Sequence, residues 1–185
     1  MMLQATQVIE THRLILRPFK ISDSHEAWVN WASDPNIQAE YGEPVYSTIG
    51  EVTQLLVNWI EQYDNTDFYR WAIIEKQSQK NIGQIAFCKV YNDCHTAEME
   101  YCIGEKYWGV GYAGEALKGI IDYTFLNTEF VKLEAYHRKD NIKSGRVLEK
   151  SDMKIVDNIE RFIRNKQLPH GEVCYAITKD NYCTK

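Results

Sequence analysis

Short stretches in which apolar and polar residues alternate predict most of the strands of this chain. Alternation is typical of a strand because successive side chains point to opposite faces of a sheet. The predicted strands cover residues 13–19, 68–74, 82–90, 97–103, 132–136, 155–163 and 173–177. A short turn separates the second strand from the third, so these two are expected to pair as a hairpin.

Apolar residues repeated every three or four positions predict four helices between these strands. The helices are expected within residues 22–34, 48–63, 113–125 and 141–150. Thr48 and Glu51 carry the signature of a capping box, and Asp34 with Pro35 is expected to end the first helix. The order β, α, α, β, β, β, α, β, α, β, β predicts an α/β fold of the α+β kind, with a central twisted mixed sheet flanked by about four helices.

Three glycines lie where the fourth predicted strand meets the third predicted helix. Gly109, Gly111 and Gly114 allow a tight turn, and the first turn of the helix offers unpaired N–H groups. Such a turn can cradle phosphate oxygens. No GK[ST] pair follows, and GxGxxG begins only at Gly109, past the middle of the chain, so a nucleotide triphosphate loop and a Rossmann oxidoreductase are both poorly supported.

Length, charge and cysteine content narrow the class of protein. A chain of 185 residues with 44% hydrophobic residues fits one domain spanning residues 1–185. Its start lacks the pattern of a signal peptide and it has no run of about 18 apolar residues, so a cytoplasmic protein without membrane association is expected. The net charge of −5 argues against a nucleic-acid partner, and the five scattered cysteines favour neither a disulfide framework nor a metal site.

Four sequence motifs, in order, resemble those of the GCN5-related N-acetyltransferase (GNAT) superfamily. ETHRLILRPF is similar to its opening TxRLxLRP strand, IGQIAF to its central hairpin, AEMEYCIGEKYWGVGYAGEAL to its core motif, and NIKSGRVLEKSDMK to NxxSxxVLEKxGF. The YWGxGYAxEAL form is close to that of the branch that acetylates the N-termini of ribosomal proteins. The chain departs at Glu100 and Gly114, where glycine and threonine are commoner, and at Asp152, which is expected to replace a left-handed glycine.

The resemblance implies a GNAT acyl-CoA N-acyltransferase fold and acetyl-CoA as the co-substrate, with no metal. Backbone N–H groups from Val110 to Glu115 would hold the pyrophosphate, the backbone of Cys102 and Ile103 would line the pantetheine arm and thioester, and Asn141 would touch the cofactor. The residues predicted in this way to bind acetyl-CoA are Cys102, Ile103, Gly109, Val110, Gly111, Tyr112, Ala113, Gly114, Glu115, Asn141 and Ser144.

Glu98 and Glu100 are the candidate general bases. They are two residues apart on one predicted strand, so they share a face, and mutual repulsion could make one of them a better base. The resemblance favours Glu98 as the acceptor of the amine's proton, whereas the alternative is a pair of solvated carboxylates. It also makes Ser144 the candidate proton donor to the thiolate, with Tyr136 and His137 as rivals.

The acceptor is expected to be an amine, and its charge is suggested by an acidic segment. Between Ile21 and Tyr69 the chain has no Lys or Arg but nine acidic residues and several aromatic rings. In the superfamily the first two helices form one wall of the acceptor cleft, so a positively charged peptide N-terminus or small cationic amine is predicted. An acyl-CoA sensor or interaction module without turnover is the rival interpretation, and the sequence leaves monomer and homodimer open.

Overall fold

The computed structural model describes residues 5–41, 43–156 and 172–183. Its described part forms an eight-stranded sheet in the order β1-β2-β3-β4-β5-β6-β8-β7. Among the strands of the described residues, only β5 and β6 run parallel, which requires a long crossover connection between them. The strands are β1 (Ile9–Glu10), β2 (Leu14–Arg17), β3 (Arg70–Glu75), β4 (Asn81–Tyr91), β5 (Thr96–Ile103), β6 (Lys132–Arg138), β7 (Lys154–Ile155) and β8 (Glu172–Thr178).

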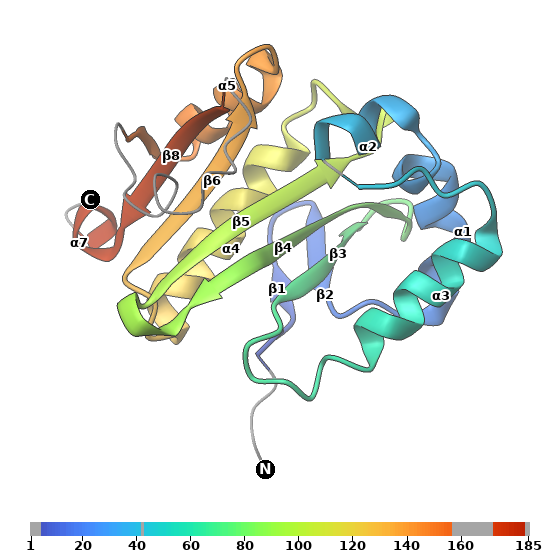
Figure 1. Cartoon of the computed structure of the whole chain (residues 1–185), viewed down its shortest axis with the longest axis horizontal. Coiled ribbons are helices and arrows are strands. Elements are labelled where there is room, and N and C mark those ends of the chain that lie inside the picture. The colour runs from blue at the N-terminus through green and yellow to red at the C-terminus, as the bar shows by residue number, and fades with distance from the viewer. Residues whose placement is uncertain (1–4, 42, 157–171, 184–185) are drawn as a thin grey trace.

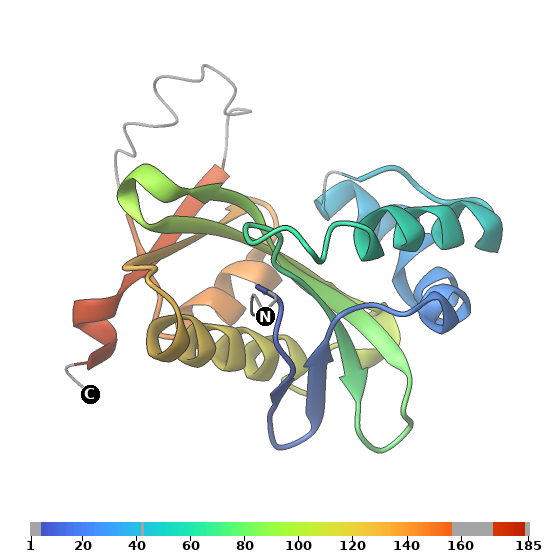
Figure 2. The same ribbon diagram turned by 90° about the horizontal axis from the view of Figure 1, so that it is seen from below.

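Helices cover the sheet on both faces (Figures 1 and 2). One face carries α1 (Ser24–Ala27), α2 (Pro35–Tyr41) and α3 (Ile49–Ile60), which pack on Ala72, Ile74 and Cys102. The other face carries the crossover helix α4 (Tyr112–Asn127) and α5 (Ile142–Lys150), and these bury the larger of the two apolar cores. At the end of the described chain, α7 (Lys179–Cys183) packs the ring of Tyr182 on Phe125.

Most of the predicted elements are confirmed, with boundaries shifted by a few residues. The capping box is present, since the Thr48 hydroxyl accepts from the Glu51 N–H and the Glu51 carboxylate accepts from the Thr48 N–H. Asp152 is left-handed, with φ of 69°, as the sequence predicted. The two-residue strand β1 and the five-residue helix α7 are too short to give a periodic signal and were not predicted. Residues 157–163 of the predicted closing strand lie outside the described residues.

The first predicted helix is divided into several turns, and it ends at Ala32, just before the predicted boundary at Asp34 and Pro35. A 3-10 turn, η1 (Ile21–Asp23), precedes α1, and a π-helical turn, η2 (Trp28–Ala32), follows it. Pro35 then begins α2, a helix that the sequence did not predict, because the first helical position tolerates a missing N–H. The Asp34 carboxylate accepts from the N–H groups of Asn36 and Ile37, as an N-cap does.

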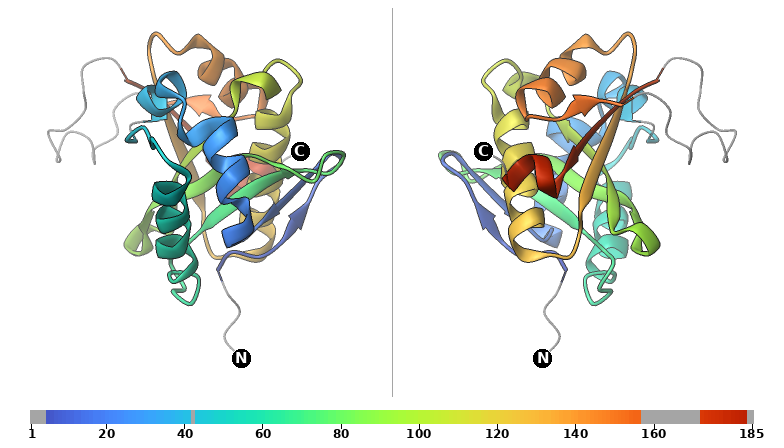
Figure 3. Two further views of the ribbon diagram at one scale, coloured as in Figure 1. Left: turned by 90° about the vertical axis from the view of Figure 1, so that its right-hand side faces the viewer. Right: turned by 90° about the vertical axis from the view of Figure 1, so that its left-hand side faces the viewer.

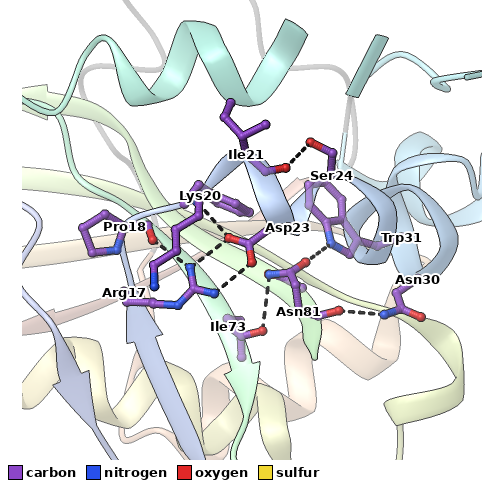
Figure 4. A network of polar contacts seen from close by, with 12 residues as sticks. Arg17, Pro18, Lys20, Ile21, Asp23, Ser24, Asn30, Trp31, Ile73 and Asn81 are labelled. Carbon is purple, nitrogen blue, oxygen red and sulfur yellow. Dashed lines mark hydrogen bonds and ion pairs between the residues drawn. The ribbon is translucent and has the colours of Figure 1, made fainter. Parts of the chain in front are cut away.

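A buried polar network joins the first helical segment to the centre of the sheet (Figure 4). The Asn81 side chain, 1% exposed, accepts from the Trp31 indole at 2.7 Å and donates to the Gly83 carbonyl at 2.9 Å. Its backbone carbonyl accepts from the Asn30 side chain at 2.6 Å. This network lies where the β3–β4 register shifts, so it fixes the start of β4 against η2.

Candidate active site

A gap opens in the sheet between β5 and β6. The two strands pair only from Thr96 to Met99 on β5 and from Lys132 to Ala135 on β6, within the described chain. Beyond Met99, β5 continues beside β4, whereas β6 continues beside β8. The strands therefore separate toward their C-terminal ends (Figure 1). The edge of β5 along this gap presents backbone groups that no strand covers, which suits an extended ligand.

The direction of the backbone groups decides which residues face the gap. The Gly104 N–H donates to the Ile82 carbonyl on the β4 side at 2.8 Å. Because the backbone groups of successive strand residues alternate between the two edges, those of Tyr101 and Ile103 face the gap and those of Cys102 face β4. The alternation thus favours Tyr101 over the predicted Cys102, whose thiol is buried beneath α1–α3, and burial raises its pKa to about 12.

The glycine loop lies at the end of β5 and leads into α4. Gly109 and Gly111 have φ values of 79° and 90°, a region that favours glycine, and Gly111 is the N-cap of α4. An added Cβ would meet no atom within 4 Å at Gly109 or Gly114, so the loop surface is open there. The Trp108 indole N–H donates to the Ile103 carbonyl at 2.6 Å, so this carbonyl already has a partner.

Ser144 and Asn141 lie at the start of α5, on the face that also carries α4. The Asn141 side-chain oxygen accepts from the Ser144 N–H at 3.1 Å, which makes Asn141 the N-cap, and its amide nitrogen donates to Glu40 at 3.0 Å. The Ser144 hydroxyl lies 2.8 Å from the Tyr101 hydroxyl. Burial raises the pKa of Tyr101 to about 12, so this phenol stays protonated at neutral pH. Sequence reasoning missed Tyr101, although its place on β5, facing α5, was readable from the alternation.

The two rival acids have other partners. The Tyr136 hydroxyl donates to Glu134 at 3.0 Å, and burial raises the pKa of Tyr136 far above its ordinary value. The ring of His137 points to the face that carries α4 and α5, where it packs on Tyr175 and lies directly under Gly145 of α5.

Glu98 and Glu100 share the opposite face of β5, the one that carries α1–α3. The Glu100 carboxylate accepts from Arg70 at 2.8 Å. Glu98 lies 3.6 Å from the Lys89 ammonium and 3.4 Å from the Tyr91 hydroxyl. Their predicted mutual repulsion is therefore offset by two separate cations, while the contacts of Glu98 are longer than those of Glu100.

Aromatic and acidic side chains surround this pair of carboxylates. The Arg70 guanidinium stacks on the Trp59 ring of α3, 4.2 Å from its centroid. Burial and the nearby Glu100 raise the pKa of Glu43. Burial and Glu98 likewise raise the pKa of Glu172 on β8. This face of the gap, bordered by Glu43, Glu98, Glu100 and Glu172, is called its acidic mouth below. The glycine loop lies at the other face.

The described residues contain neither a metal-binding cluster nor a membrane-spanning helix. No group of three His, Cys, Asp or Glu side chains among them could hold a metal ion. None of their helices has both the length and the apolar character needed to cross a membrane.

Comparison with known proteins shows the family of this chain. The family model for the acetyltransferase (GNAT) domain matches residues 13–154. A curated relative, the uncharacterized N-acetyltransferase YnaD of Bacillus subtilis, is 28% identical over 174 residues, which cover 94% of this chain and 98% of YnaD. The chain therefore belongs to the GNAT acetyltransferase family and is an N-acetyltransferase, as its motifs predicted.

Solved structures share the fold. A putative ribosomal-protein-serine acetyltransferase from Vibrio cholerae superposes with a TM-score of 0.79 at 20% identity, covering 95% of this chain and 99% of that one. The microcin C7 self-immunity acetyltransferase MccE, in complex with acetyl-CoA and AMP, superposes with a TM-score of 0.72 at 14% identity. The match covers 91% of this chain and 93% of the MccE chain. The predicted mixed-sheet acetyltransferase fold is confirmed, and acyl transfer from acetyl-CoA is the activity of this family.

Proposed function

We propose that this protein transfers the acetyl group of acetyl-CoA directly to a primary amine that enters from the opposite face of the sheet. The observation that carries the proposal is the gap between β5 and β6, whose two mouths differ in chemistry. The glycine loop and the start of α5 border one mouth, and Glu98, Glu100 and Glu43 border the other. The thioester and the amine would meet within the gap, in the arrangement that direct transfer needs.

The residues around the first mouth fit acetyl-CoA. Backbone N–H groups of the loop and of the first turn of α4 would hold the diphosphate, since helix N-termini attract anions. The edge of β5 at Tyr101 and Ile103, beyond the last residue that pairs with β6, would bind the pantetheine amides. Asn141 and Ser144 border the same mouth, and the other loop residues in this proposal are Gly109, Val110, Gly111, Tyr112, Ala113, Gly114 and Glu115.

Glu98 and Ser144 carry the proposed proton transfers. Glu98 takes a proton from the ammonium form of the acceptor, and the neutral amine forms a bond to the acetyl carbon as the carbon–sulfur bond breaks. Ser144, hydrogen-bonded to the protonated Tyr101, donates a proton to the leaving thiolate, and the second proton that the nitrogen loses on becoming an amide restores Ser144 through solvent. Glu100, bound by Arg70, orders the acceptor side of the gap instead of acting as the base.

Coenzyme binding and turnover test this proposal together. Acetyl-CoA should raise the melting temperature, as RT ln(1 + [L]/Kd) requires for a ligand of the folded state, whereas NAD should not. Turnover should then be found in a panel of peptides, polyamines, amino sugars and aminoglycosides. Binding of acetyl-CoA without acetylation of any amine would support the sensor interpretation and contradict the proposal.

The acceptor is proposed to be cationic, such as a basic peptide N-terminus. The acidic mouth should concentrate cations, and the fold is shared with a putative ribosomal-protein-serine acetyltransferase. The KM of a cationic acceptor should therefore rise severalfold as the ionic strength increases from about 0.01 M to 0.15 M, where the Debye length falls from ~30 Å to ~8 Å. A neutral amine of similar size is the control. Indifference of the cationic KM to salt, or preference for the neutral amine, would contradict the proposed charge.

A further inference from the structure

The turn between β1 and β2 contacts the glycine loop across the start of α4. This turn, residues 11–13, projects beside the β3–β4 turn (Figures 2 and 3), and the Lys76 ammonium donates to the Thr11 carbonyl at 2.7 Å. The Arg13 side chain reaches from it to the loop. Its Nε donates to a Glu115 carboxylate oxygen at 2.7 Å, and one terminal nitrogen donates to the Val110 carbonyl at 2.9 Å.

The bond to Val110 orients a peptide plane of the loop. In a planar trans peptide, the carbonyl of one residue and the N–H of the next point in opposite directions. Since the Val110 carbonyl is directed at Arg13, the Gly111 N–H is directed away from Arg13. Gly111, with φ of 90°, is flexible enough for this peptide to rotate if nothing holds it.

The arginine itself is held from several sides. The Glu115 carboxylate also accepts from the Thr11 hydroxyl and the Arg13 backbone N–H, both at 2.6 Å. Burial raises the pKa of Glu115, but these bonds outweigh it and leave the pKa below its ordinary value. The guanidinium carbon lies 4.6 Å from the Tyr112 ring centroid, and the Tyr112 hydroxyl donates to Glu75.

The negative charge of Glu115 is offset by the guanidinium of Arg13. An ionised carboxylate in the first turn of α4 lies close to the backbone that would receive the diphosphate, and like charges repel. The Arg13–Glu115 ion pair offsets this charge, and the Glu115 side chain is only 16% exposed. Without the guanidinium, the carboxylate would repel the phosphates and the Val110–Gly111 peptide would lose its restraint.

We propose that Arg13 is a positioning residue for the diphosphate of coenzyme A: it orients the Gly111 N–H through Val110 and offsets the charge of Glu115. This inference rests on the proposed coenzyme site and adds a residue that touches no part of the substrate. A merely structural role for Arg13 would affect all ligands and steps alike. A positioning role affects only ligands that carry the diphosphate.

Coenzyme A binding and acetyl-pantetheine turnover separate these two roles. For Arg13→Gln, the Kd of coenzyme A measured by isothermal titration calorimetry should rise about tenfold or more, because charge-assisted bonds are lost. The KM for acetyl-CoA should rise with little change in kcat. The kcat/KM for S-acetyl-pantetheine, which lacks the diphosphate, should stay near the wild-type value. An unchanged Kd, or an equal loss for both acetyl donors, would overturn the proposal.

Two more variants complete the test. Arg17→Gln is the matched control, because Arg17 follows on the same segment and also binds a carboxylate, that of Asp23 (Figure 4). This ion pair does not involve the glycine loop, so the Kd of the variant for coenzyme A should not change. Arg13→Lys keeps the charge but lacks the planar fork that spans Glu115 and Val110, so it should recover affinity only in part. If Arg13→Gln does not fold, Arg13→Lys provides the same comparison of the two acetyl donors. A wild type that binds no coenzyme A would remove the proposed function itself.

Discussion

Replacing Glu98 with glutamine is expected to lower kcat by about 10²-fold or more while leaving the Kd of acetyl-CoA nearly unchanged. The amide keeps the size of the side chain but cannot accept the proton of the acceptor ammonium. Glu98 lies on the face of β5 opposite α4 and α5, so the coenzyme side of the gap should be unaffected. Steady-state kinetics and calorimetry on the same preparation measure both effects.

Glu100→Gln is the matched control, since it makes the same chemical change two residues along the strand. It removes a carboxylate that Arg70 holds at 2.8 Å, so it should mainly raise the acceptor KM. A normal kcat in Glu98→Gln with a reduced kcat in Glu100→Gln would exchange the two roles. A normal kcat in both variants would show that neither carboxylate is the base.

Gly83→Ala is expected to destabilise the protein by about 3 kcal/mol or more, because it forces a backbone clash in the core. A Cβ there would lie 2.2 Å from the Cys102 carbonyl oxygen and 3.0 Å from the Ile103 Cα. Both contacts are with backbone, which cannot rotate away as a flexible side chain can. Urea unfolding measures the change, and any folded fraction should bind acetyl-CoA more weakly because Ile103 borders the gap.

Gly114→Ala is the control for the added methyl group. A Cβ at Gly114 has no atom within 4 Å, and the residue lies in the first turn of α4. Alanine is the better helix former by up to about 1 kcal/mol, so this variant should be as stable as the wild type or more stable. Equal destabilisation by the two substitutions would contradict the close approach of β4 and β5 at Gly83.

Local signals in the sequence determined much of the fold. The capping box at Thr48, the helical face of α4 and the alternation along β5 depend on residues only two to four positions apart, so they can be read without a partner. The glycine loop belongs to the same class. The division of the first helix into η1, α1 and η2 could not be read, because its turns are held by distant groups such as Asn81.

The tertiary structure decided which of these elements meet. Tyr101 reaches Ser144 across 43 residues, and Arg13 reaches Val110 across 97. The gap arises because β5 follows β4 and β6 follows β8 beyond Met99, which no local pattern encodes. The cations beside Glu98 and Glu100 come from β4 and β3, whose register depends on the irregularities along β4. By itself, the sequence named the loop and the candidate carboxylates, while sheet order and register determined their partners.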